Sequence, residues 1–209
     1  MAWYLDSALE RHKKAPYTFY VPSPSVIEKL GEGDRVRLLF MSGTEEDYLC
    51  ERMWVEITER DGDRFAGMLV NEPVSMEQPV RGETVHFRGE HVCDTEYKDP
   101  EEQRWDYYFE NRIVVSRDVI ARKEFNFLLR DFPNRDGDTG WTVSSGYEEE
   151  DDWEHADHLQ VVSLGVVLNM DDSILEFIDD EPQCAYERDP ATGRFVKIDD
   201  FDWEGYNNG

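Results

Sequence analysis

The sequence has few cysteines, and none of them is close to another. Only three occur among 209 residues, at Cys50, Cys93 and Cys184, and no CxxC pair is present. Structural zinc sites and thiol-redox sites usually need such pairs, so neither is expected. An odd number of widely spaced thiols favours reduced cysteines, and we expect a cytoplasmic protein.

Long hydrophobic runs are missing as well. The longest mostly apolar stretch, residues 161–170, is interrupted by Ser163, Gly165 and Asn169, whereas a membrane-spanning helix needs about 20 apolar residues. Residues 1–14 hold no apolar stretch of the length, about 7–15 residues, that a secretory signal contains. We therefore expect neither a membrane location nor export.

Positive charge is scarce. The chain has 22 Lys and Arg against 48 Asp and Glu, and its formal net charge is −26. Proteins that bind nucleic acid or anionic membranes present positive charge to phosphate groups, so neither is an expected partner. Strong acidity can accompany disorder. However, 6 Trp, 10 Tyr and 11 Phe supply large apolar rings for a core, and we expect a folded, soluble, acidic protein.

Residues 18–95 have the pattern of a small antiparallel sheet with one short helix. Ser23-Pro24-Ser25 suits the start of a helix, and Gly31 suits its end. Asp61-Gly62 between two apolar runs predicts a two-residue hairpin turn. Alternation of apolar and polar residues predicts four strands, at residues 36–40, 53–57, 64–70 and 84–87.

Polar and acidic residues dominate 96–110, where Pro100 also lies. This composition is typical of a linker or an exposed helix. We expect an N-terminal small sheet domain with a short helix at residues 1–98, a linker at 99–112, a second domain at 113–198 and a flexible acidic tail at 199–209. The halves differ in charge: 24 acidic and 14 basic residues in 1–112 give net −10, and 24 and 8 in 113–209 give net −16.

The strand pattern restarts in the second half. The spacing of Ile174, Leu175 and Ile178 predicts a helix capped by Asp171 or Asp172. Strands are predicted at residues 113–116, 125–129 and 141–144, a helical turn at 118–122, and a hairpin from 184–188 and 194–198. The predicted fold class is α+β, with two small domains that are each a mostly antiparallel sheet with one or two helices.

The most distinctive segment is the acidic run, residues 148–157, in which seven of ten positions are acidic and none is basic. Such dense negative charge repels itself unless cations or a partner balance it. A solvated loop, a surface for a basic protein and a metal site are the three interpretations. Trp153 favours the second, because an indole among acids can anchor an interface with a charged rim. The candidate partner-binding residues are Tyr147, Glu148, Glu149, Glu150, Asp151, Asp152, Trp153 and Glu154.

Two patterns resemble metal sites. His155 and His158 lie one helical turn apart beside carboxylates, but no HExxH pattern accompanies them, and surface histidines are the better interpretation. Residues 134–138 start like a calcium loop. That loop needs Gly at its sixth and Glu at its twelfth position, where Thr139 and Ser145 stand, so an EF-hand is rejected.

A structural interpretation fits residues 136–146 better. Asp136-Gly137 and Gly140 suit turns that direct Trp141 into the core. We assign Asp138, Gly140, Trp141 and Gly146 to this structural motif and expect no metal there.

Motifs of catalysis and cofactor binding are absent. The sequence has no GxSxG nucleophile elbow, no Walker A loop and no third glycine after Gly31-Glu32-Gly33. We therefore expect neither a cofactor nor an enzymatic activity.

Residues 113–198 resemble a bacterial immunity-protein domain of polymorphic toxin systems, first catalogued as a domain of unknown function. The resemblance rests on the motifs Val114-Val115-Ser116-Arg117, Asp138-Thr139-Gly140-Trp141, Ser145-Gly146-Tyr147-Glu148, Val162-Ser163-Leu164-Gly165, Leu168-Asn169 and Ala185-Tyr186-Glu187-Arg188. It implies that the protein binds a cognate toxin domain and blocks it.

A second small bacterial domain of unknown function resembles residues from about 18 to 95. The matching motifs are Glu51-Arg52-Met53-Trp54-Val55-Glu56, Gly67-Met68-Leu69-Val70-Asn71-Glu72-Pro73 and Arg81-Gly82-Glu83-Thr84-Val85. That domain is often associated with toxin-immunity gene neighbourhoods, and it implies a fold more than a role.

Together these features predict an immunity-type protein that neutralises a toxin with a basic surface through its own acidic surface. Two alternatives stay open. One is a metal-dependent or small-molecule-binding enzyme that uses His155, His158 and nearby carboxylates. The other is an acidic regulator that mimics DNA. The sequence leaves the oligomeric state open.

Overall fold

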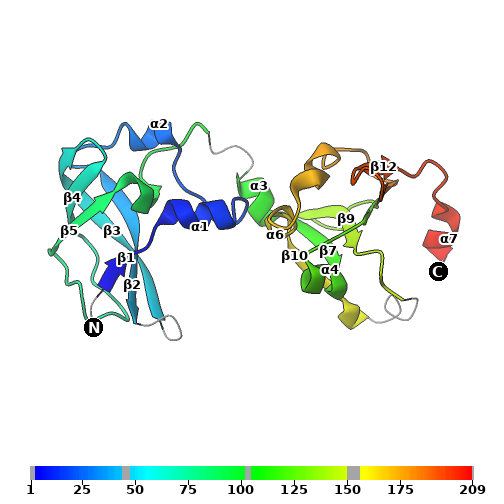
Figure 1. The fold of residues 1–209 in the computed structure, drawn as a ribbon, viewed down its shortest axis with the longest axis horizontal. Coiled ribbons are helices and arrows are strands. Elements are labelled where there is room, and N and C mark those ends of the chain that lie inside the picture. The colour runs from blue at the N-terminus through cyan, green and yellow to red at the C-terminus, as the bar shows by residue number, and fades with distance from the viewer. Residues whose placement is uncertain (1–2, 44–47, 102–104, 150–155, 209) are drawn as a thin grey trace. The chain divides into compact units, whose positions relative to one another are not determined.

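The computed structural model describes residues 3–43, 48–101, 105–149 and 156–208. The chain divides into two compact units, which we call unit 1 (residues 1–105) and unit 2 (residues 106–209). Helix α3 (Trp105–Glu110) begins at the last residue of unit 1 (Figure 1). Each unit has its own sheet.

Unit 1 is an antiparallel sheet with short helices packed against it. The strand order is β1-β2-β3-β4-β5, and β6 also pairs with β2. The strands are β1 (Trp3–Leu5), β2 (Arg35–Gly43), β3 (Tyr48–Asp61), β4 (Arg64–Leu69), β5 (Thr84–Arg88) and β6 (Val92–Thr95). The remaining elements are α1 (Ala8–Lys14), α2 (Pro24–Ile27) and the 3-10 turn η1 (Gly89–His91).

Strand β2 is buried on both faces. Phe40 and its alternate neighbours join the main core, whereas Leu39 faces a smaller cluster with Ala8 of α1 and Cys93 of β6. The main core consists of Leu30, Val36, Leu38, Phe40, Met53, Val55, Ile57, Phe65, Leu69, Met76, Val85, Phe87 and Val92. The predicted hairpin at Asp61-Gly62 is confirmed, since Asp61 pairs with Arg64 and Gly62 has a φ of +59°.

The helices of unit 1 are only partly as predicted. Pro24 stands at the first position of α2 and Ser23 at its N-cap, but the α-helix ends at Ile27 rather than near Gly31. The chain continues in i-to-i+3 turns, in which the Leu30 N–H donates to the Ile27 carbonyl. Strand β1 was not predicted because it has only three residues, and helix α1 was not predicted because charged residues interrupt its apolar pattern.

Unit 2 is a mixed sheet in the order β10-β7-β9-β8-β11-β12. All its pairings are antiparallel except that of β7 with β9. Its strands are β7 (Arg112–Ser116), β8 (Phe127–Arg130), β9 (Asp138–Ser144), β10 (Leu159–Ser163), β11 (Cys184–Arg188) and β12 (Phe195–Lys197). Its other elements are α4 (Arg117–Arg122), η2 (Ala156–His158), α6 (Leu164–Leu168), η3 (Asp172–Glu176) and α7 (Trp203–Asn208).

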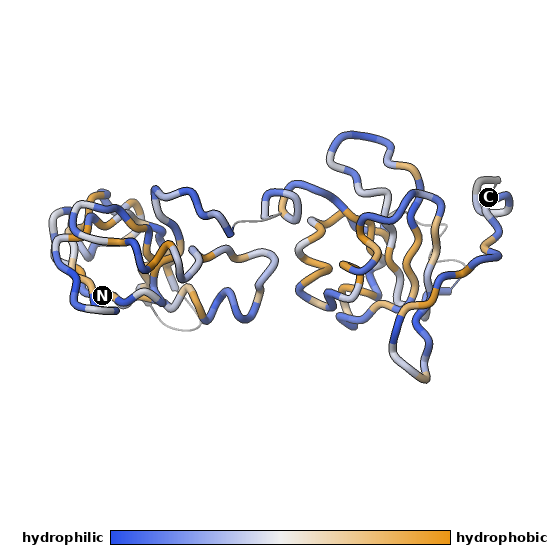
Figure 2. Tube along the Cα trace, turned by 90° about the horizontal axis from the view of Figure 1, so that it is seen from above, coloured by the Kyte–Doolittle hydropathy of each residue, from blue (hydrophilic) through white to orange (hydrophobic). Residues whose placement is uncertain are grey.

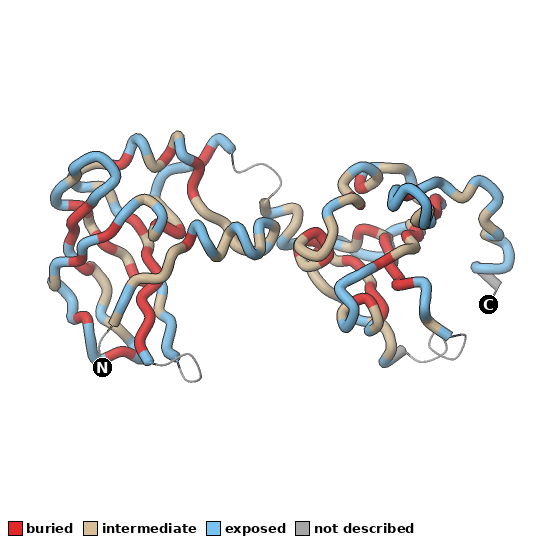
Figure 3. The backbone as a smooth tube through the Cα atoms, in the orientation of Figure 1, coloured by how far each residue is buried: buried red, intermediate tan, exposed pale blue. Residues whose placement is uncertain are grey.

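The core of unit 2 centres on Trp141 of β9, which is fully buried and whose indole N–H donates to the Ile178 carbonyl (3.4 Å). Arg130 covers the indole ring, with its guanidinium 5.5 Å from the ring centre. In both units the buried and the hydrophobic stretches follow the strands (Figures 2 and 3).

The predicted fold class, α+β with two small and mostly antiparallel sheet domains, is confirmed. Strand β8 starts at Phe127, so Phe125 precedes the strand that was predicted to contain it. The tail, predicted to be flexible, contains α7, and Phe201 before it lies 6.1 Å from the ring of Phe127. Within the described ranges, none of the helices has the length and apolarity that crossing a membrane requires.

Candidate functional site

The parallel pairing of β7 and β9 positions the candidate site. Val115 lies opposite Val143, so both strands end at the same edge of the sheet. At that edge β7 passes into α4 at Ser116, and β9 passes into Ser145-Gly146-Tyr147-Glu148. Residues about 30 positions apart in the sequence are therefore brought together.

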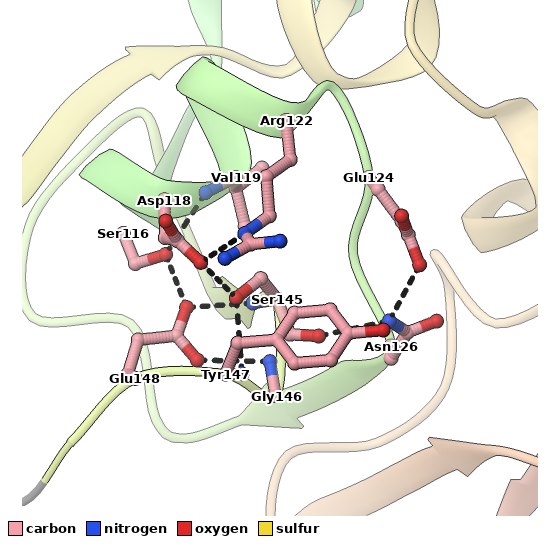
Figure 4. Close-up of polar contacts among 10 residues, drawn as sticks. All are labelled: Ser116, Asp118, Val119, Arg122, Glu124, Asn126, Ser145, Gly146, Tyr147 and Glu148. Atoms are coloured by element: carbon pink, nitrogen blue, oxygen red, sulfur yellow. Dashed lines mark hydrogen bonds and ion pairs between the residues drawn. The ribbon is translucent and has the colours of Figure 1, made fainter.

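The Glu148 carboxylate turns back toward the sheet and accepts three hydrogen bonds (Figure 4). Their donors are the Ser116 hydroxyl (2.5 Å), the Ser145 backbone N–H (2.7 Å) and the Gly146 backbone N–H (2.8 Å). The Ser116 hydroxyl in turn accepts from the Val119 N–H (3.2 Å) and so caps α4. We call Ser116, Ser145, Gly146 and Glu148 the Glu148 anchor, because it ties the loop after β9 to the start of α4.

The environment of Glu148 stabilises its charge. Burial by itself raises the pKa of this carboxyl, but the hydrogen bonds from Ser116 and from Ser145 outweigh burial, and the pKa lies below its ordinary value. With its oxygens engaged by three donors and its pKa lowered, Glu148 is a poor general base. Its geometry is that of a structural carboxylate.

A second carboxylate, Asp118, supports the same loop from α4. Its carboxylate accepts hydrogen bonds from the Ser145 hydroxyl (2.8 Å) and from the Arg122 guanidinium (2.6 Å). Both bonds lower the pKa of Asp118, and the bond from Ser145 has the larger effect. The Ser145 hydroxyl also accepts from the Tyr147 N–H (3.1 Å). Figure 4 shows both carboxylates converging on this fully buried serine.

Tyr147 is the exposed member of the loop. Its side chain is 57% exposed, and the Arg122 guanidinium lies 4.5 Å from its ring centre. A guanidinium over an aromatic face is attractive and restricts the ring. Gly146 before it has a φ of +83°, a conformation that glycine adopts without strain. The tyrosine ring is thus held in place at the surface.

A cavity of about 360 Å³ lies beside this ring. Its lining comes from α4 and its N-cap, the loop after β9, the end of η2 and the start of β10, and consists of Ser116, Arg117, Asp118, Arg122, Tyr147, Glu148, Glu149, His158 and Leu159. Arg117 pairs with Asp157 at 4.0 Å, and Arg122 pairs with Asp118. Both basic residues of the cavity are therefore balanced by an acidic neighbour.

The predicted partner-binding residues divide into three groups. Tyr147 and Glu149 are exposed, whereas the Glu148 carboxylate is directed into the anchor. Glu150, Asp151, Asp152, Trp153 and Glu154 lie outside the described residues, as does His155. His158 lines the cavity, and in the described ranges no three His, Cys, Asp or Glu residues lie close enough to hold a metal ion.

Of the predicted structural motif, Asp138 and Gly140 form the turn before Trp141, whereas Gly146 lies in the loop after β9. The Asp138 carboxylate accepts from the Gly140 N–H (2.9 Å) and from the Asn134 N–H (3.1 Å), and the Thr139 hydroxyl donates to the Arg112 carbonyl (2.8 Å). Gly140 has a φ of +74° and passes close to the Asp131 carbonyl. These contacts fix the start of β9 and direct Trp141 inward.

Ser116, Asp118, Arg122 and Asn126 were missed as site residues. Asn126 donates to the Ser145 carbonyl (2.8 Å) and to Glu124 (3.0 Å). In the sequence, Ser116, Asp118 and Arg122 have the spacing of a capped helix. The serine suits the N-cap, and the acid and the arginine are four positions apart on one helix face. The contact of this helix with residues 145–148 depends on the parallel pairing, which no local pattern in the sequence reveals.

The stability of unit 2 should fall at acidic pH through Glu148. The pKa of this carboxyl is lowered on folding, so its contribution is present above the ordinary value of 4.5 and is lost as the pH falls through the folded value. Between about pH 5 and pH 3, the free energy of unfolding should decrease less steeply in Glu148→Gln than in the wild type. Urea unfolding at a series of pH values measures this slope, and an equal slope would show that Glu148 titrates normally.

Two family models match the chain. The model described as the immunity protein Imm33 domain matches residues 113–199, and the model described as an uncharacterized protein conserved in bacteria (DUF2314) matches residues 13–124. Both predicted resemblances are thereby confirmed, and the N-terminal match extends beyond residues 18–95. No curated protein and no solved structure gives a significant match.

Proposed function

We propose, from the premise that the chain belongs to the DUF2314 family of uncharacterized proteins conserved in bacteria and carries an Imm33 immunity-protein domain, that it binds a bacterial toxin domain and neutralises it. The immunity-protein domain gives the protein an immunity-type role. The contact surface is the face around Tyr147 and the acidic run that follows it. The partner is a toxin domain with a basic surface.

The observation that carries this proposal is the Glu148 anchor. A surface loop usually loses conformational freedom when it binds, and that loss weakens the complex. Here Tyr147 is already held by the anchor before it and by Arg122 across its ring. An exposed tyrosine whose ring is restricted by a guanidinium, beside a cavity, is suited to anchor a protein interface.

The charge of unit 2 supports the choice of a basic partner. Residues 113–209 carry net −16, and the acidic run contributes seven acids without a base. At the described end of the run, Arg117 pairs with Asp157 and Arg122 pairs with Asp118. Complementary charge on two proteins raises their association rate and disfavours binding of partners with like charge.

A non-catalytic role agrees with the site. The hydroxyls of Ser116 and Ser145 each donate to a carboxylate, but both carboxylates have lowered pKa values and both are engaged by other donors. Activating a serine would need a base with a pKa near the working pH. We therefore propose binding, rather than turnover, as the means of neutralisation.

Removing charge from the acidic run should slow association. In Glu149→Gln/Glu150→Gln/Asp151→Asn/Asp152→Asn, the association rate with the toxin domain should fall about tenfold at low salt, and its dependence on salt should flatten. The matched control removes four exposed acids of unit 1, with Glu59, Glu72, Glu77 and Glu96 changed to Gln. Association rates are measured by surface plasmon resonance. An equal decrease of the association rate in both variants would assign the effect to net charge alone.

The experiment that tests the proposed function is growth rescue. Cells that express the cognate toxin domain should survive when they also express this protein. In Tyr147→Ala, the affinity should fall about 30-fold and rescue should weaken, because the anchor residue is lost. Phe132→Ala is the control, since Phe132 is 62% exposed in the same unit but lies outside the cavity. Failure of the wild type to bind or rescue would overturn the proposal.

A further inference from the structure

Unit 1 contains a groove of about 550 Å³ between α1 and α2, far in the sequence from the Glu148 anchor. Its lining is more apolar than polar. The apolar part comes from both helices, from the loop between them, from the start of β6 and from the last residue of the unit, and consists of Leu9, Val21, Pro22, Ile27, Val92 and Trp105. We call this the α1–α2 groove.

Carboxylates surround these apolar side chains. The acidic lining residues are Glu28, Asp63, Glu90, Asp99 and Glu101, and no described lining residue is Lys or Arg. His12 is the one titratable base among the described lining residues. In the part of the chain that the structure covers, no cationic side chain pairs with the carboxylate of Glu28 or of Glu101, and both residues are exposed. The Arg60 guanidinium donates to the Glu28 backbone carbonyl (2.8 Å).

The wall formed by Asp99 is rigid. This buried carboxylate accepts from the Tyr20 hydroxyl (2.8 Å), from the Ser23 N–H (2.6 Å) and hydroxyl (2.9 Å), and from the Glu101 N–H (2.9 Å). It thereby ties the loop before α2 to residues 99–101. The rings of Tyr20 and Trp105 lie 5.7 Å apart in the same wall. A groove held open in this way needs little reordering to accept a ligand.

From this geometry we infer that the α1–α2 groove binds a cationic, partly apolar segment of a partner protein. Apolar side chains of the segment fill the groove, and its Lys or Arg side chains reach Glu28 and Glu101 at the rim. Aromatic faces such as those of Tyr20 and Trp105 also attract cations. This site goes beyond the proposed function, because it lies in unit 1, mostly within the DUF2314 match, and uses none of the residues of the Glu148 anchor.

The test measures binding of a fluorescein-labelled peptide of about twelve alternating Lys and Leu residues to the full chain, by anisotropy at about 150 mM salt. In Leu9→Ser, which removes an apolar groove residue, and in Glu28→Gln/Glu101→Gln, which removes the rim charges, the affinity should fall about fivefold or more. Comparator peptides replace Lys by Glu, or Leu by Ser, and both should bind more weakly.

Matched variants outside the groove separate the site from the overall negative field. Val74→Ser removes a side chain that is 92% exposed in the same unit, and Glu59→Gln/Glu72→Gln removes two exposed charges. Both should change the affinity less than about twofold.

Equal losses in these controls, or equal binding of the Lys/Ser peptide, would show attraction by charge alone and would overturn the proposal. Equal binding of the Glu/Leu peptide would also overturn it. Each result is independent of toxin binding, so the two proposals fail separately.

Discussion

Replacing Glu148 by alanine should lower the free energy of unfolding of unit 2 by about 3 kcal/mol. The change leaves the buried Ser116 hydroxyl and the Ser145 N–H without their carboxylate partner. Hydrogen bonds to a charged group contribute more than neutral ones, and buried donors without a partner retain their desolvation cost. Urea unfolding monitored by hydrogen exchange at the amides of β7 and β9 measures the stability of unit 2 separately from that of unit 1.

The control for this variant is its neighbour. Glu149 is exposed, and Glu149→Ala should change the free energy of unfolding by less than about 0.5 kcal/mol. A double-mutant cycle of Ser116→Ala and Glu148→Ala should give a coupling energy of about 1 kcal/mol or more, because the two side chains share a hydrogen bond. If Glu148→Ala and Glu149→Ala behave alike, the anchor does not stabilise the unit.

Gly140→Ala should destabilise unit 2 by more than about 3 kcal/mol. Gly140 has a φ of +74°, and a Cβ at this position would lie 2.1 Å from the Asp131 carbonyl oxygen. Backbone must move to relieve such a contact, and the movement disturbs the turn that directs Trp141 into the core. Chemical denaturation measures the loss.

Gly137→Ala is the matched control, because Gly137 has nearly the same φ, +75°, but its Cβ would lie 3.4 Å from the nearest atom, the Glu110 carbonyl oxygen. This variant has the cost of the left-handed conformation, about 1 kcal/mol, without the clash. The difference between the two variants therefore isolates the close approach at Gly140. Similar losses in both would mean that Asp131 moves aside easily.

The sequence predicted elements where local patterns are strong. The hairpin at Asp61-Gly62, the strands around it and the N-terminal position of Pro24 all follow from turn chemistry and alternation. Elements with weak or interrupted patterns were missed. Strand β1 has three residues, and α1 has charged residues at most of its positions.

The candidate site was predictable only in part. Tyr147 and the acidic run stand out in the sequence because of their composition. The inward direction of Glu148 does not, because in a dense acidic run every carboxylate looks the same. Its partners come from β7 and α4, and only the parallel pairing of β7 with β9 brings them near. Such long-range pairings leave no periodic signal in a single sequence.

The α1–α2 groove was not predicted for a similar reason. Its carboxylates are scattered from Glu28 to Glu101 and are separated by strands that contribute to the core. In the sequence they belong to an acidic background that is spread over the whole chain. The fold gathers five of them around apolar side chains, and this combination distinguishes the groove from an ordinary solvated surface.

The measurement that tests the central claim most directly is hydrogen–deuterium exchange of the full chain with and without a toxin domain that it neutralises. Binding through the face around Tyr147 predicts slower exchange in the complex at Ser145–Glu149 and at Asp157–Leu159, which border the same cavity. Exchange in β4 and β5 of unit 1, which line neither this cavity nor the neighbouring one beside Tyr147, should be unchanged. Protection confined to those strands or to other parts of the chain, with no change at Ser145–Glu149, would contradict the account.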